Sequence, residues 1–172
     1  MSRATLTKWI VAGAATLLAQ SVVAQTDGRR YWDENDAMAI RALLADGFET
    51  SWNGHQPATG ATPDKCGPDA IFINTTGGWL KGCESWVELI TPLHAPGGPF
   101  HDHTRRHAVE ELHFLRPDVA IAVVKTYDIK RGGVPTTGEE TRGLVVVSKE
   151  GGRWKLAANQ NARIQPSPVG DR

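Results

Sequence analysis

The segment that most constrains the fold is Arg142–Ile164, whose residues predict two β-strands joined by a tight turn. The apolar run 144–147 and the run that starts at Trp154 flank Lys-Glu-Gly-Gly, which is typical of a turn. One face of the second strand would carry Trp154, Leu156, Ala158, Gln160 and Ala162, and the other mostly Lys155, Asn159, Asn161 and Arg163. Gln160 would then give an otherwise apolar inner face a polar end. This pattern predicts a wall of a ligand cavity or, with equal weight, a surface hairpin that only closes a sheet.

The N-terminus has the pattern of a secretory signal peptide at residues 1–24. Arg3 and Lys8 form a basic region, residues 9–19 are apolar, and small residues precede a cleavage point after Ala24. The apolar run is too short for a membrane anchor. We therefore expect a periplasmic or secreted protein with no membrane attachment after cleavage, a flexible start at 25–34, one domain at 35–165 and a tail at 166–172.

Charge and cysteine content narrow the functional classes. Without Arg3 and Lys8, 17 of the 19 basic residues remain against 19 acidic ones, a formal charge of −2, which does not favour nucleic acid or an anionic membrane as partner. Cys66 and Cys83 are predicted to form a disulfide in an oxidising compartment, with two buried thiols as the alternative. The sequence contains no phosphate loop, dinucleotide fingerprint or Ser-His-Asp arrangement, so we expect no cofactor.

The rest of the chain predicts an α+β protein. Ile40, Leu44, Phe48 and Trp52 recur every four residues in a helix that begins near Asp33–Asp36 and is ended by Gly54. A Gly- and Pro-rich segment (53–68), a strand (70–74), its return (79–81) and a second helix with Trp86, Ile90 and an interrupting Pro92 follow. A β-meander then starts near His107, which predicts helices packed on one face of a curved antiparallel sheet.

A tight turn at Pro117-Asp118 fixes a predicted register in the meander. If Arg116 pairs with Val119, then Phe114 lies opposite Ile121, Leu112 opposite Val123 and Glu110 opposite Lys125. The other face would hold Glu111 and His113, which are more plausible as outer or interface residues than as ligand contacts.

Several of these pieces, in this order, are similar to the nuclear-transport-factor-2-like superfamily, and closest to its SgcJ/EcaC and SnoaL-like branch. The matching pieces are Phe48…Trp52-Asn53, 68–74, Gly77…Lys81-Gly82, His94, 115–120 and 152–161, within residues 35–164. The resemblance implies a cone of curved sheet closed by helices, a fold that hosts isomerases, cyclases, dehydratases and binding modules. Asn74 occupies the position of the catalytic Asp of the ketosteroid-isomerase branch, and an amide cannot act as a general base. Isomerase chemistry of that type is therefore disfavoured.

Histidines are the other candidates for chemistry. His101, His103 and His107, with Glu110, could ligate a metal, but the long spacing and the intervening Arg105 and Arg106 favour a polar strand start, so we assign no metal site. His94 follows the apolar stripe of the second helix, near the cavity mouth implied by the resemblance. It is the candidate acid–base group, although a packed histidine is the commoner outcome.

The sequence therefore predicts an exported domain that binds a small apolar or aromatic molecule in a pocket between helices and sheet. The predicted ligand contacts are Trp52, Asn74, His94 and Gln160. Two alternatives remain open: a SnoaL-like or SgcJ-like enzyme acting on a polyketide-like or aromatic substrate with His94 as base, and a homodimeric interaction module that pairs through the outer face of the sheet.

Overall fold

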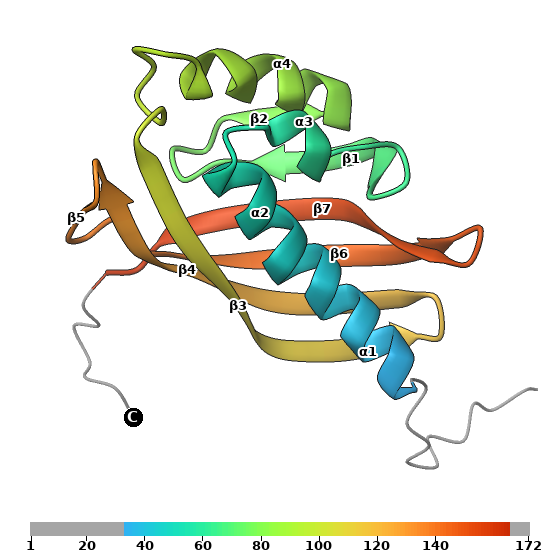
Figure 1. The fold of residues 1–172 in the computed structure, drawn as a ribbon. Helices are drawn as coiled ribbons and strands as arrows, with labels where there is room; N and C mark the ends of the chain where they lie inside the picture. Colours follow the sequence, from blue (N-terminus) through green and yellow to red (C-terminus); the bar gives the residue numbers. More distant parts are fainter. Residues whose placement is uncertain (1–32, 166–172) are drawn as a thin grey trace, which may run out of the picture.

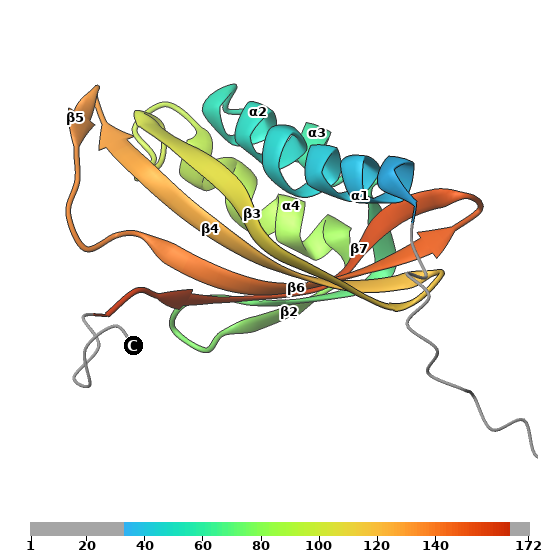
Figure 2. The same cartoon turned by 90° about the horizontal axis from the view of Figure 1, so that it is seen from below.

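The computed structural model describes residues 33–165, in which helices cover one face of a strongly curved sheet (Figures 1 and 2). The helices are α1 (Glu34–Arg41), η1 (Ala42–Gly47), α2 (Phe48–Asn53), α3 (Pro57–Gly60) and α4 (Cys83–His94). The strands are β1 (Cys66–Ile73), β2 (Trp79–Lys81), β3 (His103–Arg116), β4 (Val119–Arg131), β5 (Val134–Pro135), β6 (Thr141–Glu150) and β7 (Arg153–Arg163). The predicted α+β class is confirmed. The predicted signal peptide, residues 25–32 of the predicted flexible start and the whole of the predicted tail (166–172) lie outside the described residues.

The sheet is mixed rather than antiparallel. Its strand order is β2-β1-β7-β6-β4-β3, with β5 paired to β4. β1 runs parallel to β7, whereas the other paired strands are antiparallel. The sequence could not show this pairing, because β1 and β7 are far apart in the chain. Within residues 33–165, no helix is long and apolar enough to cross a membrane.

The first helix runs from Glu34 to Asn53 with a π-helical middle. The Asp33 side chain caps it by accepting a hydrogen bond from the Asp36 amide at 2.8 Å. A four-residue spacing drifts about 40° per step around an α-helix. The wider turn of η1 compensates for part of this drift. Ile40 and Leu44 are therefore fully buried, and Trp52 nearly so, all against the sheet.

Cys66 and Cys83 form the predicted disulfide, which joins the start of β1 to the start of α4, with their Cα atoms 6.1 Å apart. Both residues belong to the main apolar core. α4 continues two residues past Pro92 and ends at His94, so the proline ends the helix as expected. The disulfide thereby fixes the N-terminal end of α4 against the sheet.

Several β-bulges alter the predicted pairing and facing of residues, and one of them leaves Glu110, the predicted partner of Lys125, out of the register between Val109 and Glu111. Arg116 pairs with Val119 as expected, but a bulge at Leu115 sets Phe114 opposite Ala120 instead of Ile121, so the predicted register is wrong beyond the turn. Another bulge, at Ala157, lets Val147 pair with Leu156 and Val146 with Ala158. Glu111 and His113 face outward, as predicted.

Candidate functional site

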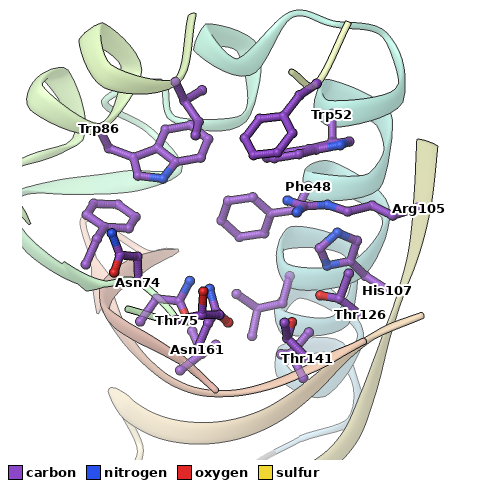
Figure 3. A pocket seen from close by; sticks show the side chains of 17 residues that line it. Phe48, Trp52, Asn74, Thr75, Trp86, Arg105, His107, Thr126, Thr141 and Asn161 are labelled. Atoms are coloured by element: carbon purple, nitrogen blue, oxygen red, sulfur yellow. The ribbon is translucent and has the colours of Figure 1, made fainter. Parts of the chain in front are cut away.

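The main cavity lies between the helices and the concave face of the sheet and has a volume of about 240 Å³ (Figure 3). Its apolar lining consists of Leu44, Phe48, Trp52, Phe72, Trp86, Ile90, Phe100, Val124 and Val145. Its polar lining consists of Asn74, Thr75, Arg105, His107, Thr126, Thr141, Asn159 and Asn161. A second cavity of about 260 Å³ adjoins it beneath α4 and shares eight of these residues. Apolar walls with a few convergent polar groups are the usual composition of a small-molecule site.

Helix α2 positions the polar residues of β3 by two sets of hydrogen bonds. Asn53 Nδ2 donates to the Arg105 carbonyl and the Arg105 amide donates to Asn53 Oδ1, both at 2.9 Å. One turn earlier, Glu49 Oε2 accepts from the His107 amide at 3.0 Å. Four helical residues rise about 6 Å and two strand residues about 6.6 Å, so the two spacings match. These bonds satisfy three backbone groups of edge strand β3 and fix Arg105 and His107 at one wall.

Arg105 brings a positive charge into the cavity. Its guanidinium carbon lies 3.1 Å from the centroid of the Trp52 ring, against the ring face (Figure 3). Within the described residues it forms no ion pair, and its Nε is buried without a hydrogen-bond partner. Burial lowers the pKa of Arg105 to about 9, so the guanidinium keeps its charge at pH 7.

His107 is a neutral imidazole at the same wall. Burial, and after it the positive charge of Arg105, lowers the pKa of His107 to about 3. Its Nε2 is buried without a partner. At neutral pH the ring therefore carries no charge, with one ring nitrogen a hydrogen-bond donor and the other an acceptor.

Unsatisfied polar atoms gather around the main cavity. Seven side-chain nitrogen or oxygen atoms of the described residues are buried without a hydrogen-bond partner, and four of them belong to cavity-lining residues. These four are Trp52 Nε1, Arg105 Nε, His107 Nε2 and Asn159 Oδ1. Each such atom costs about 1–3 kcal/mol relative to a bonded one. The lining as a whole, with polar side chains among its apolar ones, is able to bond a molecule that carries both polar groups and apolar surface.

Asn74 lies at the cavity mouth, where its oxygen is already in use. Asn74 Oδ1 accepts from the Thr76 amide at 3.0 Å, the Thr76 hydroxyl at 2.8 Å and the Gly78 amide at 2.9 Å. This arrangement holds the turn between β1 and β2. Asn74 was predicted to contact the ligand, and its side-chain amide nitrogen is the group that remains available for this.

His94, the predicted base, does not line the cavity. It is 3% exposed, and its ring packs edge-on to Trp52 with the centroids 4.3 Å apart. Its Nδ1 lies 3.3 Å from Nδ1 of His55. Burial, followed by the charges of His55, Arg105 and His103, lowers the pKa of His94 to about 4. The placement at the cavity mouth was wrong because α4 turns this residue into the packing behind Trp52.

Gln160 is also outside the cavity, and Asn159 and Asn161 line it instead. The bulge at Ala157 inserts one residue into β7 and reverses the facing of every later side chain. Gln160 is exposed on the outer face, paired with Leu144 and Ile73. The inner face does have a polar end, but its amides belong to Asn159 and Asn161 and not to Gln160.

The four residues of the histidine-rich segment point to different surroundings. His101 lies near the His94 carbonyl, with Nδ1 at 3.4 Å, and His103 Nε2 lies 3.7 Å from Glu139. His107 lines the cavity, whereas Glu110 pairs with Arg142. Among residues 33–165, no group of three or more His, Cys, Asp or Glu side chains could hold a metal ion.

Sequence reasoning therefore missed Arg105, His107, Asn159 and Asn161 as cavity residues. Arg105 and His107 did carry a usable signal, because they are two residues apart in a strand and must share a face. Asn159 and Asn161 could not be found in the same way, because the bulge at Ala157 breaks the alternation of facing along β7. Of the four predicted contacts, Trp52 and Asn74 lie in the lining.

Solved structures show which fold this is, whereas the sequence matches no family model and no curated protein. A domain of unknown function with a cystatin-like fold from Nostoc punctiforme superposes with a TM-score of 0.69 at 20% identity, covering 78% of this chain and 80% of that one. A nuclear-transport-factor-2-like protein from Shewanella oneidensis gives 0.61 at 17% identity, with coverages of 74% and 98%. Hexachlorocyclohexane dehydrochlorinase from Novosphingobium barchaimii gives 0.58 at 16% identity, with coverages of 76% and 88%. The chain thus has the nuclear-transport-factor-2-like cone fold, as predicted, while the SgcJ/EcaC and SnoaL-like branch stays a prediction.

Proposed function

We propose that this chain is an exported binding protein that holds one small, largely apolar molecule in the main cavity. The observation that carries the proposal is the combination, in one lining, of nine apolar side chains with polar side chains such as Arg105, Asn159 and Asn161. A volume of about 240 Å³ suits a compact molecule, because drug-sized ligands occupy pockets of about 300 Å³ or more. The disulfide supports an oxidising compartment such as a periplasm or the cell exterior.

An enzymatic role on the same fold is the weaker alternative. The dehydrochlorinase among the structural neighbours is an enzyme, but a likeness at 16% identity extends to the fold alone. His94 lies outside the cavity, which leaves His107 as the only histidine of the lining. A general base works best with a pKa near the working pH, and the pKa of His107 is about 3. The main cavity also has no carboxylate in its lining, so binding is favoured over proton transfer.

Filling the cavity should weaken binding. Val124 on β4 lines the cavity, whereas its neighbour Val123 faces the outer side of the sheet. We expect Val124→Phe to weaken binding of naphthamide, a neutral planar probe, by at least about tenfold, because the added ring takes up the ligand space. Isothermal titration calorimetry measures this.

Val123→Phe is the matched control, with the same substitution one residue away on the opposite face. It should bind naphthamide as the wild type does, and thermal melts of both variants check that the fold is kept. Equal affinity for the wild type and Val124→Phe would contradict the cavity as the binding site. A native mass spectrum of protein purified from its own compartment would identify a retained molecule.

We also propose that the chain forms a homodimer through the outer face of the sheet. Two rows of paired outer residues cross four strands: Ile121, Val146, Ala158 and Ile71 in one, and Val123, Leu144, Gln160 and Ile73 in the other. Seven of these eight residues are apolar, and Leu144 and Ile71 are 50% and 43% exposed. A contiguous exposed apolar patch of this kind is typical of a protein interface.

Light scattering tests the dimer. The wild type should have the mass of two chains at micromolar concentration, and Leu144→Glu should convert it to single chains by placing a charge in the centre of the patch. Val134→Glu, on the exposed strand β5, should leave the dimer intact. A wild type with the mass of one chain would contradict the proposal.

A further inference from the structure

The charge of the main cavity is unbalanced. Its lining includes the cation Arg105 and no Asp or Glu. Glu49, the acidic residue that hydrogen-bonds the same strand, is engaged with the His107 amide at 3.0 Å and lies 3.9 Å from Arg106. His107 itself is neutral at pH 7, since burial lowers its pKa. The wall around Arg105 therefore has a positive charge that the described residues do not neutralise.

Arg105 is half-buried, and a cation that is partly removed from water without a counter-ion is costly. Here the structure holds it in place. Asn53 fixes the backbone of Arg105 with two hydrogen bonds, and the Trp52 ring packs against the guanidinium face. With one face covered, the edge of the guanidinium is the part left to bond a ligand. A planar carboxylate matches that edge with two parallel hydrogen bonds.

We propose that the ligand of the main cavity is a compact monocarboxylate with a flat apolar body, whose carboxylate pairs with Arg105. This inference rests on the proposed binding function and specifies its ligand class. The apolar body would lie against Phe72 and Trp86, which face each other as stacked rings 5.7 Å apart at the other side of the cavity. One cation balances one negative charge, so a phosphate with two charges would remain partly unpaired.

Calorimetry with two isosteric probes tests the ligand class on the full-length mature protein. Naphthoate and naphthamide have the same ring system and differ in that only the first is charged. The wild type should bind naphthoate about 10- to 100-fold more tightly than naphthamide, as expected for a charge-assisted hydrogen-bonded pair. Arg105→Met should remove this preference and keep naphthamide binding, while Arg105→Lys should retain part of it.

Arg106→Met is the matched control, because Arg106 is the adjacent residue, is exposed and faces away from the cavity. It should keep the wild-type preference for naphthoate. Equal affinities of the wild type for the two probes would overturn the carboxylate inference and leave the binding function standing. A preference that survives in folded Arg105→Met would overturn the assignment to Arg105. Failure of the wild type to bind either probe would overturn the proposed function itself and, with it, the ligand class.

Discussion

Replacing both cysteines by alanine should lower the free energy of unfolding by about 3 kcal/mol. Cys66 and Cys83 are 17 residues apart, and closing a loop of about this length removes roughly that much conformational entropy from the unfolded chain. Alanine is the suitable replacement because both side chains are buried in the core, where serine would add an unpaired hydroxyl. Urea denaturation of the variant and the wild type measures the difference.

Reduced wild-type protein is the control for this experiment. It has the native side chains without the bond, so it should match the double variant to within about 1 kcal/mol. Because α4 provides Trp86 and Ile90 to the cavity, breaking the bond at its N-terminal end should also weaken ligand binding. An unchanged urea midpoint in both forms would contradict a stabilising role of the disulfide.

Local chemistry made the helices predictable. The Asp33 cap, the stripe of Ile40, Leu44 and Trp52, and the stop at Gly54 depend on residues within a few positions of one another. The π-helical segment was not predicted as such. The strict four-residue spacing was nevertheless its signal, since such spacing stays on one face only if the helix is locally wider.

Bulges set the limit of strand prediction. Alternation predicts facing only while each residue has one partner, and an extra residue reverses everything beyond it. The bulge at Ala157 moved Gln160 out of the cavity and brought Asn159 and Asn161 in. The bulge at Leu115 shifted the partner of Phe114 to Ala120, which is buried, so the altered register still buries an apolar face. The predicted and the observed strand registers therefore both bury apolar residues, and the hydrophobic pattern alone could not distinguish them.

The roles of the charged and titratable residues could not be predicted from the sequence, because they depend on which other residues pack around each side chain in the fold. Arg105 looked like an obstacle to a metal site, but it is the cavity's cation, because Asn53 and Trp52 hold it there. His94 and His107 looked alike as isolated histidines. Only the packing of α4 and β3 distinguishes one behind Trp52 from one in the cavity wall.

Acidification should destabilise the protein well before its carboxylates titrate. His107 has a pKa of about 3 in the folded chain, against about 6.5 when unfolded, so the unfolded state binds more protons between these values. The free energy of unfolding is therefore highest above pH 6.5 and falls as the pH is lowered toward 3. From His107 alone, the loss at pH 5 is about 2 kcal/mol. His94, whose pKa is lowered to about 4, adds to it in the same direction.

Urea denaturation at pH 7.5 and pH 5.0 measures this loss, because ordinary carboxylates are still mostly ionised at both values. His107→Gln should reduce the difference by about 2 kcal/mol, since glutamine keeps a polar side chain that cannot be protonated in this range. His113→Gln, on the exposed outer face, is the control and should keep the wild-type difference. If the wild type were equally stable at both pH values, the assignment of His107 as a neutral, half-buried ring beside Arg105 would be contradicted.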